Sequence, residues 1–150
     1  MFYASGRGFT LIELLIVITL TLIILVFVAG NYSQFFHSSL VDGEVDSLVS
    51  LLRLAKSKAI AEVNDSKFKV EISATTFTLK QEVGNIDLEI HRMNEQTKAS
   101  STSLPLSVTF EKLTGAVISC SPCTITIANT PTAFRQKSVV ISDQGLITVQ

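Results

Sequence analysis

Tryptophan is absent from the sequence, and the 150 residues contain only two cysteines and two histidines. His37 and His91 lie far apart, so with Cys120 and Cys123 they do not give the ligand spacing of a structural zinc site. The seven glycines are scattered and form no phosphate-binding loop, and no serine or cysteine sits in a nucleophile-elbow motif. We therefore expect no metal site, no cofactor and no enzymatic activity.

An excess of charge of one sign is also missing, because 12 Lys and Arg residues face 13 Asp and Glu residues. The formal net charge of -1 creates no overall field that would attract nucleic acid, so such binding would need a local basic patch. Arg135 and Lys137, which flank Gln136, are weak candidates for DNA binding. Two charges of this kind are more typical of a solvated strand edge, and DNA binding is kept as an alternative that we do not favour.

Hydrophobic residues make up 47% of the chain, and a nearly uninterrupted apolar block extends from Phe9 to Ala29. As a helix this block would rise about 30 Å, which is about the hydrocarbon thickness of a bilayer. The segment before it, Met1 to Gly8, is polar and carries one charge, Arg7. A secretory signal peptide has its small-residue cleavage site after the apolar stretch, whereas here Gly8 precedes it. Cleavage at Gly8 would leave the apolar block on the mature protein.

The charges on either side of the apolar block predict its orientation. Arg7 precedes the block, and the first charges after it are acidic, beginning with Asp42. The positive-inside rule then favours a cytoplasmic N-terminus. We expect a single-pass membrane protein with most of the chain exported.

The two cysteines lie close together in Cys120-Ser121-Pro122-Cys123. This is the spacing of a redox-active pair, which requires a helix N-terminus to lower the pKa of one thiol. The pair instead follows the apolar residues Val117–Ile118 and precedes a predicted strand, Thr124–Ala128, with no amphipathic helix after it. In an oxidising exported compartment we favour a structural disulfide that closes a turn.

One residue of the apolar block, Glu13, is acidic. A central acidic residue in a membrane helix costs roughly 2.5 to 3.5 kcal/mol, less near the membrane edge, and such residues usually have a partner. Cleavage after Gly8 would create a positively charged amine at Phe9, one helical turn from Glu13. That amine, in the same or a neighbouring subunit, can compensate the carboxylate, so we expect charge to couple cleavage with assembly.

Residues Arg7 to Glu13 read RGFTLIE, and this run closely resembles the class III leader of type IV prepilins and type II secretion pseudopilins. The resemblance implies recognition through Arg7, cleavage between Gly8 and Phe9 by a prepilin peptidase, N-methylation of Phe9, and a role for Glu13 in docking each subunit to its neighbour. The resemblance also implies that the chain is held in the bacterial cytoplasmic (inner) membrane before assembly. The implied partners are the lipid bilayer before assembly, an inner-membrane assembly platform, and other pilins or pseudopilins in a periplasmic or extracellular filament. The alternative is an ordinary signal anchor with a chance acidic residue.

Helical periodicity resumes beyond Gly30-Asn31, a weak point because glycine costs about 1 kcal/mol relative to alanine within a helix. Apolar residues then recur at spacings of three and four, which predicts an amphipathic helix. They are Val45, Leu48, Val49, Leu52, Ala55, Ala59, Ile60 and Val63. We expect one long helix from about Phe9 to Glu62, ended by Asn64-Asp65-Ser66, whose second half packs on a globular domain.

From Lys67 onward the apolar period changes to two, which indicates antiparallel strands. The first predicted hairpin joins Lys67–Ile72 to Thr76–Lys80. Further predicted strands lie at Ile86–Ile90, Leu106–Phe110, Val117–Ile118, Thr124–Ala128, Val139–Ile141 and Leu146–Val149, the last pair around a turn at Asp143-Gln144-Gly145. The Ser/Thr-rich stretch Asn94–Ser103 has no apolar periodicity, and we predict a surface loop there.

The helical segment Leu48–Ile60 resembles the corresponding segment of the GspH/FimT-like branch, which contains minor pseudopilins of type II secretion and minor type IV pilins. Members of that branch have a long N-terminal helix packed on a β-rich domain, so the resemblance implies an α+β, pilin-like fold. They usually close with a Gly-Arg pair after the last turn, where this chain has Gly145-Leu146. Some FimT-like pilins bind DNA through a basic C-terminal surface, which makes DNA uptake the alternative function.

The predicted organisation has four parts: a leader at 1–8, a membrane and assembly helix at 9–30, its amphipathic continuation at 31–63 and a β-rich domain at 64–150. We expect a structural, non-enzymatic subunit that is assembled into a type II secretion pseudopilus or a type IV pilus. The resemblance to minor components implies a low-abundance role near the tip or in initiating assembly.

Overall fold

The computed structural model describes residues 10–102, 104–120, 122–130 and 135–150, without the side chains of residues 29–34 and 37. The chain divides into two compact units, Met1–Phe36 and His37–Gln150, and each is described by itself. The boundary at Phe36 falls within the segment that the sequence pattern predicted to be the amphipathic continuation of the helix. Arg7, Gly8 and Phe9 lie outside the described residues.

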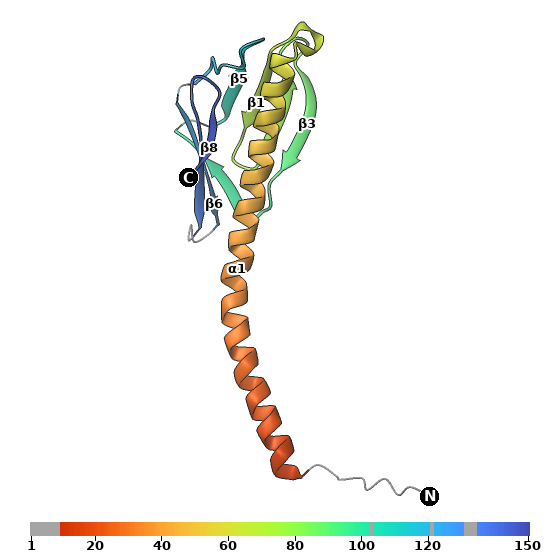
Figure 1. The fold of residues 1–150 in the computed structure, drawn as a ribbon, viewed down its shortest axis with the longest axis vertical. Helices are drawn as coiled ribbons and strands as arrows, with labels where there is room; N and C mark the ends of the chain where they lie inside the picture. The colour runs from red at the N-terminus through yellow and green to blue at the C-terminus, as the bar shows by residue number, and fades with distance from the viewer. Residues whose placement is uncertain (1–9, 103, 121, 131–134) are drawn as a thin grey trace, which may run out of the picture. The chain divides into compact units, whose positions relative to one another are not determined.

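A single helix, α1, runs from Leu11 to Ile60 without interruption (Figure 1). It includes the predicted weak point Gly30-Asn31, so the backbone remains helical there. Thr10 caps its N-terminus, because the Thr10 Oγ1 accepts a hydrogen bond of 3.3 Å from the Glu13 backbone N–H. The expectation of one long helix is therefore confirmed over the described residues.

The helix ends slightly before the predicted stop signal. Glu62 adopts a left-handed conformation with φ of 50°, and a short 3-10 turn, η1 (Val63–Asp65), follows it. Ser66 comes next and is fully buried. Its hydroxyl donates to the Lys67 carbonyl and accepts from the Val83 N–H, which fastens the end of the helix to the turn that contains Val83.

The described residues of the second unit form two four-stranded antiparallel sheets. The first has the order β3-β2-β1-β5, with β1 (Phe68–Ile72), β2 (Thr76–Gln81), β3 (Ile86–Arg92) and β5 (Leu106–Phe110). The second has the order β4-β6-β7-β8, with β4 (Thr97–Ser100), β6 (Cys123–Asn129), β7 (Gln136–Ile141) and β8 (Ile147–Val149).

The core of this unit lies where the C-terminal half of α1 packs on the sheets (Figure 1). Leu48 and Leu52 of α1 and Phe68, Phe77 and Phe110 of the strands are fully buried. Each buried side chain of this size contributes roughly 1.5–3 kcal/mol. The predicted apolar stripe is buried from Val45 to Ala59, whereas Ile60 and Val63 at its end are exposed.

The predicted surface loop Asn94–Ser103 is wrong, because β4 lies within it and pairs with β6. Thr97 and Ala99 face the core with 1% and 3% exposure, and Lys98 and Ser100 between and after them are exposed. Successive side chains of β4 are alternately buried and exposed, as expected for a strand with one face on the core. Its inward side chains are too small and polar to produce a hydrophobic signal in the sequence.

The predicted strand at Val117–Ile118 is also wrong. Val117 forms only an isolated bridge with Phe110. The preceding turn bends sharply, with positive φ at Leu113 and Gly115, and the Gly115 N–H bonds to the Glu111 carbonyl. The Val117 N–H bonds to the Asp143 carbonyl and the Ile118 N–H bonds to the Thr109 carbonyl, so this segment divides its hydrogen bonds between two neighbours and forms no ladder with either.

Strand β3 forms where it was predicted, but its apolar side chains Ile86, Leu88 and Ile90 are exposed by 43–56%. A register shift between Leu79 and Lys80 of β2 interrupts the pairing of these two strands. The residue of β3 that pairs with the buried Leu79 of β2 is Glu89, which is not apolar. The apolar residues of β3 are thus left out of the core.

Candidate assembly helix and surface of the globular unit

The described part of the first unit consists of Thr10 and α1 as far as Phe36. Residues Leu11–Val28 have the length and composition of a membrane-spanning helix, with a mean hydropathy of 3.1. None of this segment is buried within the chain. An apolar surface of this extent is normally covered by lipid or by other helices.

The polar side chains of Leu11–Val28 are Glu13, Thr19 and Thr21. The two threonine hydroxyls are satisfied within the helix, since they donate to the carbonyls of Leu15 at 2.8 Å and Val17 at 2.7 Å. Among the described residues, no side chain or backbone group bonds to the Glu13 carboxylate. Glu13 lies in the first turn of α1, where the helix dipole favours a negative charge. Its carboxylate is the one side chain of this segment that needs a partner from outside the described residues.

Cys120 and Cys123 are joined by a disulfide, with their Cα atoms 5.4 Å apart. Cys123 begins β6 and is buried, and Cys120 is half-buried against the core. The residues described after the pair form a strand and not a helix. This environment lacks the helix N-terminus that a redox-active thiolate requires.

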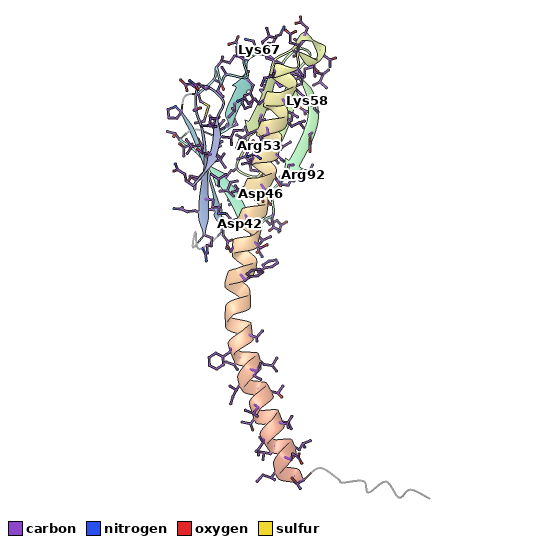
Figure 2. All side chains as sticks on the ribbon, viewed as in Figure 1. Asp42, Asp46, Arg53, Lys58, Lys67 and Arg92 are labelled. Atoms are coloured by element: carbon purple, nitrogen blue, oxygen red, sulfur yellow. A yellow bond between two sulfur atoms is a disulfide. The ribbon has the colours of Figure 1, made fainter. Side chains whose placement is uncertain are left out.

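Arg135 immediately precedes β7 and Lys137 lies within it, and both line a hollow of about 260 Å³. Lys137 Nζ is 2.8 Å from Asp42 Oδ1 on α1, so an acidic group offsets its charge. Several other basic side chains are also ion-paired: Lys67 with Glu111, Lys69 and Lys80 with Glu71, and Lys112 with Asp65. Charged side chains of both signs are distributed along α1 and over the sheets (Figure 2). Phosphate binding needs clustered, available cations, and this distribution does not favour it.

Glu44 is a residue that the sequence reasoning missed. It is 8% exposed and lies on α1, and its Oε1 accepts a 2.8 Å hydrogen bond from the Asn94 backbone N–H. Its Oε2 is 2.7 Å from His91 Nε2, and the His91 ring stacks on Phe77 with centroids 5.9 Å apart. Glu44 therefore fastens both the end of β3 and the segment that crosses to β4 onto the helix. The available signal was an acidic residue at an apolar-stripe position, next to Val45.

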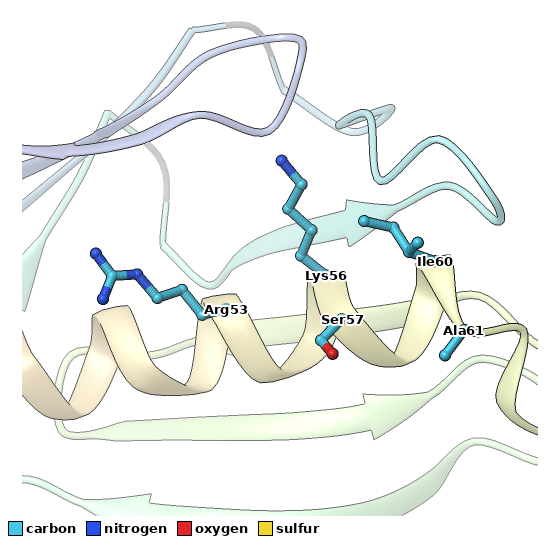
Figure 3. A pocket seen from close by; sticks show the side chains of 5 residues that line it. All are labelled: Arg53, Lys56, Ser57, Ile60 and Ala61. Atoms are coloured by element: carbon cyan, nitrogen blue, oxygen red, sulfur yellow. The ribbon is translucent and has the colours of Figure 1, made fainter.

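Lys56 makes a second link between α1 and the sheets (Figure 3). Its Nζ donates to the carbonyls of Gly145 at 2.9 Å and Gln144 at 3.3 Å, in the turn between β7 and β8. Gly145 has a φ of +70°, and a Cβ atom there would lie 2.3 Å from the Gly115 carbonyl oxygen. The glycine of the predicted closing turn is thus required by a close approach of two backbone segments.

The outer face of the first sheet carries a network of ion pairs centred on Glu71. Lys80 Nζ lies 2.8 Å from Glu71 Oε2, and Lys69 Nζ lies 3.0 Å from Glu71 Oε1. The hydrogen bond from Lys80, with a further one from Lys69, holds the pKa of Glu71 below its usual 4.5. The hydrogen bond to Glu71 and a second to Asp87 raise the pKa of Lys80 above its usual 10.5.

The chain is similar to known proteins both in its N-terminal sequence motif and in its fold. Residues 4–29 match the family model described as the prokaryotic N-terminal methylation motif. The fold is similar to that of the type IV minor pilin FimU of Pseudomonas aeruginosa, with a TM-score of 0.62 and 15% identity over 83% of this chain and 92% of that chain. It is also similar to the minor pseudopilin EpsH from the type 2 secretion system of Vibrio cholerae, with a TM-score of 0.57 and 16% identity over 74% of this chain and 96% of that chain. No curated protein sequence matches the chain.

The N-terminal motif and the fold are together similar to those of type IV pilin-like proteins. The α+β architecture of the chain, a long apolar N-terminal helix packed on antiparallel sheets, confirms the predicted fold class. More narrowly, the solved structures that share this fold are a minor pilin and a minor pseudopilin.

Proposed function

We propose that this protein is a minor subunit of a type IV pilus or a type II secretion pseudopilus, anchored in the cytoplasmic membrane before assembly. Prepilin peptidase cuts the chain between Gly8 and Phe9, and the new N-terminus of Phe9 is methylated. Arg7 contributes to recognition of the leader. The methylation-motif match over residues 4–29 supports this processing.

The observation that carries the proposal is the unpartnered carboxylate of Glu13 on an apolar helix that the chain itself does not cover. A carboxylate in lipid is costly, so a compensating positive group has a large effect on where the helix is stable. Cleavage after Gly8 supplies such a group, the amine of Phe9. In a neighbouring subunit this amine can pair with Glu13 and set the register between adjacent helices.

The rest of the apolar helix works in two environments. In the membrane it is covered by lipid, with the N-terminus in the cytoplasm and the unit His37–Gln150 exported. In the filament the same surface packs against the helices of other pilins or pseudopilins, after extraction by the inner-membrane assembly platform. Helix packing of this kind needs no specific pocket, since exposed apolar side chains surround Leu11–Val28 on all sides.

Mass spectrometry of the mature protein tests the processing step. In cells that contain a prepilin peptidase, we expect a chain that begins at Phe9 and carries one added methyl group. Replacing the small residue at the cleavage site, as in Gly8→Val, should retain the leader. A wild-type chain that still begins at Met1 in those cells would contradict the proposal.

Incorporation into filaments tests the role of Glu13. Glu13→Gln removes the charge at nearly constant volume, and we expect the variant to be cleaved normally but to be lost from sheared filament fractions. Thr19→Val is the matched control, because it changes a polar residue of the same helix whose hydroxyl is already satisfied. Normal incorporation of Glu13→Gln would remove the charge mechanism. Whether the filaments are pili or pseudopili follows from which other subunits copurify with the protein.

A further inference from the structure

The end of α1 carries a sequence motif that its role as a helix stop does not explain. Asn64-Asp65-Ser66 has the form Asn-x-Ser with a middle residue other than proline, which is the acceptor motif for N-linked glycans in exported proteins. Glu62 stands two positions before the asparagine, where bacterial oligosaccharyltransferases use an acidic residue. The other Asn-x-Ser run of the sequence, Asn31-Tyr32-Ser33, has Ala29 in place of the acid. The extended motif is therefore complete at Asn64 and not at Asn31.

The structure presents Asn64 at the surface of the globular unit. Asn64 lies in η1, the short turn that follows α1, and residues 61–65 are all exposed. In Figure 1 this turn projects from the end of the unit at which α1 ends. A glycan attached to Asn64 would extend into solvent without displacing a buried side chain.

The side-chain amide of Asn64 can carry a sugar and keep its contact with the first sheet. Its Nδ2 donates a hydrogen bond of 3.4 Å to Gln81 Oε1. A primary amide has two N–H donors, and an N-glycosidic bond replaces one of them. The N–H that remains can still donate to Gln81, so the fold tolerates the modified residue.

The backbone conformation of the turn does not by itself account for an asparagine at this position. Asn64 has a φ of 55°, in the left-handed region where asparagine is enriched. However, Glu62 and Asp65 have φ values of 50° and 51° in the same turn, and neither is asparagine or glycine. The turn thus forms left-handed residues without asparagine, and the Asn-x-Ser spacing calls for another explanation.

Ser66 determines when the modification can take place. A transferase of this class binds the hydroxyl group two positions after the asparagine, but Ser66 is fully buried. Its hydroxyl donates to the Lys67 carbonyl at 3.0 Å and accepts from the Val83 N–H at 3.1 Å. An enzyme can reach this hydroxyl only when the turn that contains Val83 is separated from the end of the helix. The acceptor is therefore open before the unit folds and closed in the native state.

We propose that Asn64 is an N-glycosylation site, modified from a polyprenyl-diphosphate-linked oligosaccharide before the globular unit closes around Ser66. The Asn64 Nδ2 forms a bond to C1 of the first sugar, and the bond from C1 to the diphosphate oxygen breaks. The amide gives up one proton as the polyprenyl diphosphate leaves. The glycan lies beside Ile60 and Val63, which are 44% and 36% exposed, and shields apolar surface at the end of α1. The inference rests on the proposed function in one respect, since the unit must be exported to meet the transferase in a cell.

Timed glycosylation of the full chain tests the site. The chain is unfolded with urea in detergent micelles, and the urea is then diluted. A purified bacterial oligosaccharyltransferase and its lipid-linked oligosaccharide are added either at once or after refolding is complete. We expect mass spectrometry to find one glycan on the peptide that contains Asn64, with at least about tenfold more product after early addition, because the native state hides Ser66. An unmodified Asn64 after early addition, in a tube where a control acceptor peptide is glycosylated, would overturn the proposal, and equal product at both times would overturn the role of Ser66.

Variants identify the acceptor, and they are tested even where they fold poorly, because the substrate is the unfolded chain. Asn64→Asp should abolish the product while it keeps a residue that tolerates the left-handed backbone. Ser66→Ala should abolish the product and Ser66→Thr should retain it. Glu62→Gln should reduce the product, whereas Glu82→Gln, which alters an exposed acid outside the motif, should not. Asn31→Gln is the matched control and should leave the product unchanged, and a glycan found on Asn31 instead of Asn64 would overturn the proposal.

The outcome is independent of the processing mechanism. The reaction in micelles requires neither cleavage at Gly8 nor the charge of Glu13, so an unmodified Asn64 removes the glycan and leaves the proposed subunit role intact. In cells that make the transferase and its donor, we expect the same glycan on the exported unit. A chain that is glycosylated in micelles but not in those cells would overturn the proposed export while the acceptor role of Asn64 remained.

Discussion

Replacing Glu44 by alanine should destabilise the globular unit more than any surface acid of the chain. The substitution removes the acceptor for the Asn94 N–H and the partner of His91 Nε2 at once. A hydrogen bond to a charged group is worth roughly 1.5–3 kcal/mol, and leaving a buried donor unpaired costs about 1–3 kcal/mol. The His91 side chain is 34% exposed and can turn to water, so its part is the smaller one.

We therefore expect Glu44→Ala to lower the free energy of unfolding by about 2–4 kcal/mol, set mainly by the Asn94 contact. That is a large fraction of the roughly 5–15 kcal/mol that stabilises a typical domain. Glu44→Gln keeps an oxygen acceptor for the Asn94 N–H but loses the charge, and its effect should be about 1 kcal/mol.

The assay is denaturant unfolding of the full chain in micelles, followed by circular dichroism of the strands. Amide hydrogen exchange adds a local readout, since the Asn94 N–H and the end of β3 should lose protection first. Glu95→Ala is the control, because Glu95 is exposed on the same crossing segment and its side chain has no partner among the described residues. If Glu44→Ala and Glu95→Ala are equally stable, the reasoning about a buried clamp is refuted.

Three further predictions concern the same unit. Gly145→Ala should lower the free energy of unfolding by about 2–5 kcal/mol, because the backbone is left-handed there and the new Cβ atom would lie 2.3 Å from the Gly115 carbonyl oxygen. Gly43→Ala is the control: this glycine lies at an open position of the helix, so the variant should be more stable by about 0.5–1 kcal/mol. Equal effects of the two substitutions in denaturant unfolding would contradict this reasoning. The lowered pKa of Glu71 contributes stability that is present above pH 4.5 and is lost as the pH falls further. The difference in the free energy of unfolding between the wild type and Lys80→Gln should therefore be small, because solvent screens these groups, and it should shrink below pH 4.5. A difference that grows with acidity would contradict the argument. Reducing the Cys120–Cys123 disulfide should cost about 2 kcal/mol, because the closed loop is short, and Cys120→Ser with Cys123→Ser should then be insensitive to reductant in the same assay.

The parts of this fold that were predictable from sequence are those with strong local periodicity. The apolar block, the stripe from Val45 to Ala59 and the first hairpin each repeat a pattern over several turns or residues, and each is present in the structure. Strand β4 was not predictable in this way, because Thr97 and Ala99 are inward residues of low hydrophobicity. Its position depends on pairing with β6, which is distant in sequence. Apolar character alone was equally misleading at Ile118, because its segment divides its hydrogen bonds between two neighbours and forms no ladder with either.

The link that Lys56 makes between α1 and the sheets was not predictable for a related reason. Lys56 lies outside the predicted apolar stripe, where a charged side chain is usually solvated, yet its partners are the carbonyls of Gln144 and Gly145 near the other end of the chain. A backbone acceptor carries no sequence signature of its own. Sequence periodicity can therefore indicate a charged residue at a position expected to be apolar. It identifies the partner of that residue only when the partner is a side chain close by in the sequence.

Glu13 and Glu44 show how structure separates two similar signals. Both are acids set among apolar residues of the same helix, and from sequence alone either could be a buried ion-pair partner or a site for another molecule. The structure gives the Glu44 carboxylate two partners from the chain's own globular unit, so its role is internal. It gives the Glu13 carboxylate none among the described residues, on a segment that the chain leaves entirely uncovered. Since an unpaired carboxylate is unfavourable both in lipid and between packed helices, Glu13 is where a positive group from processing or from a neighbour would have its largest effect on assembly.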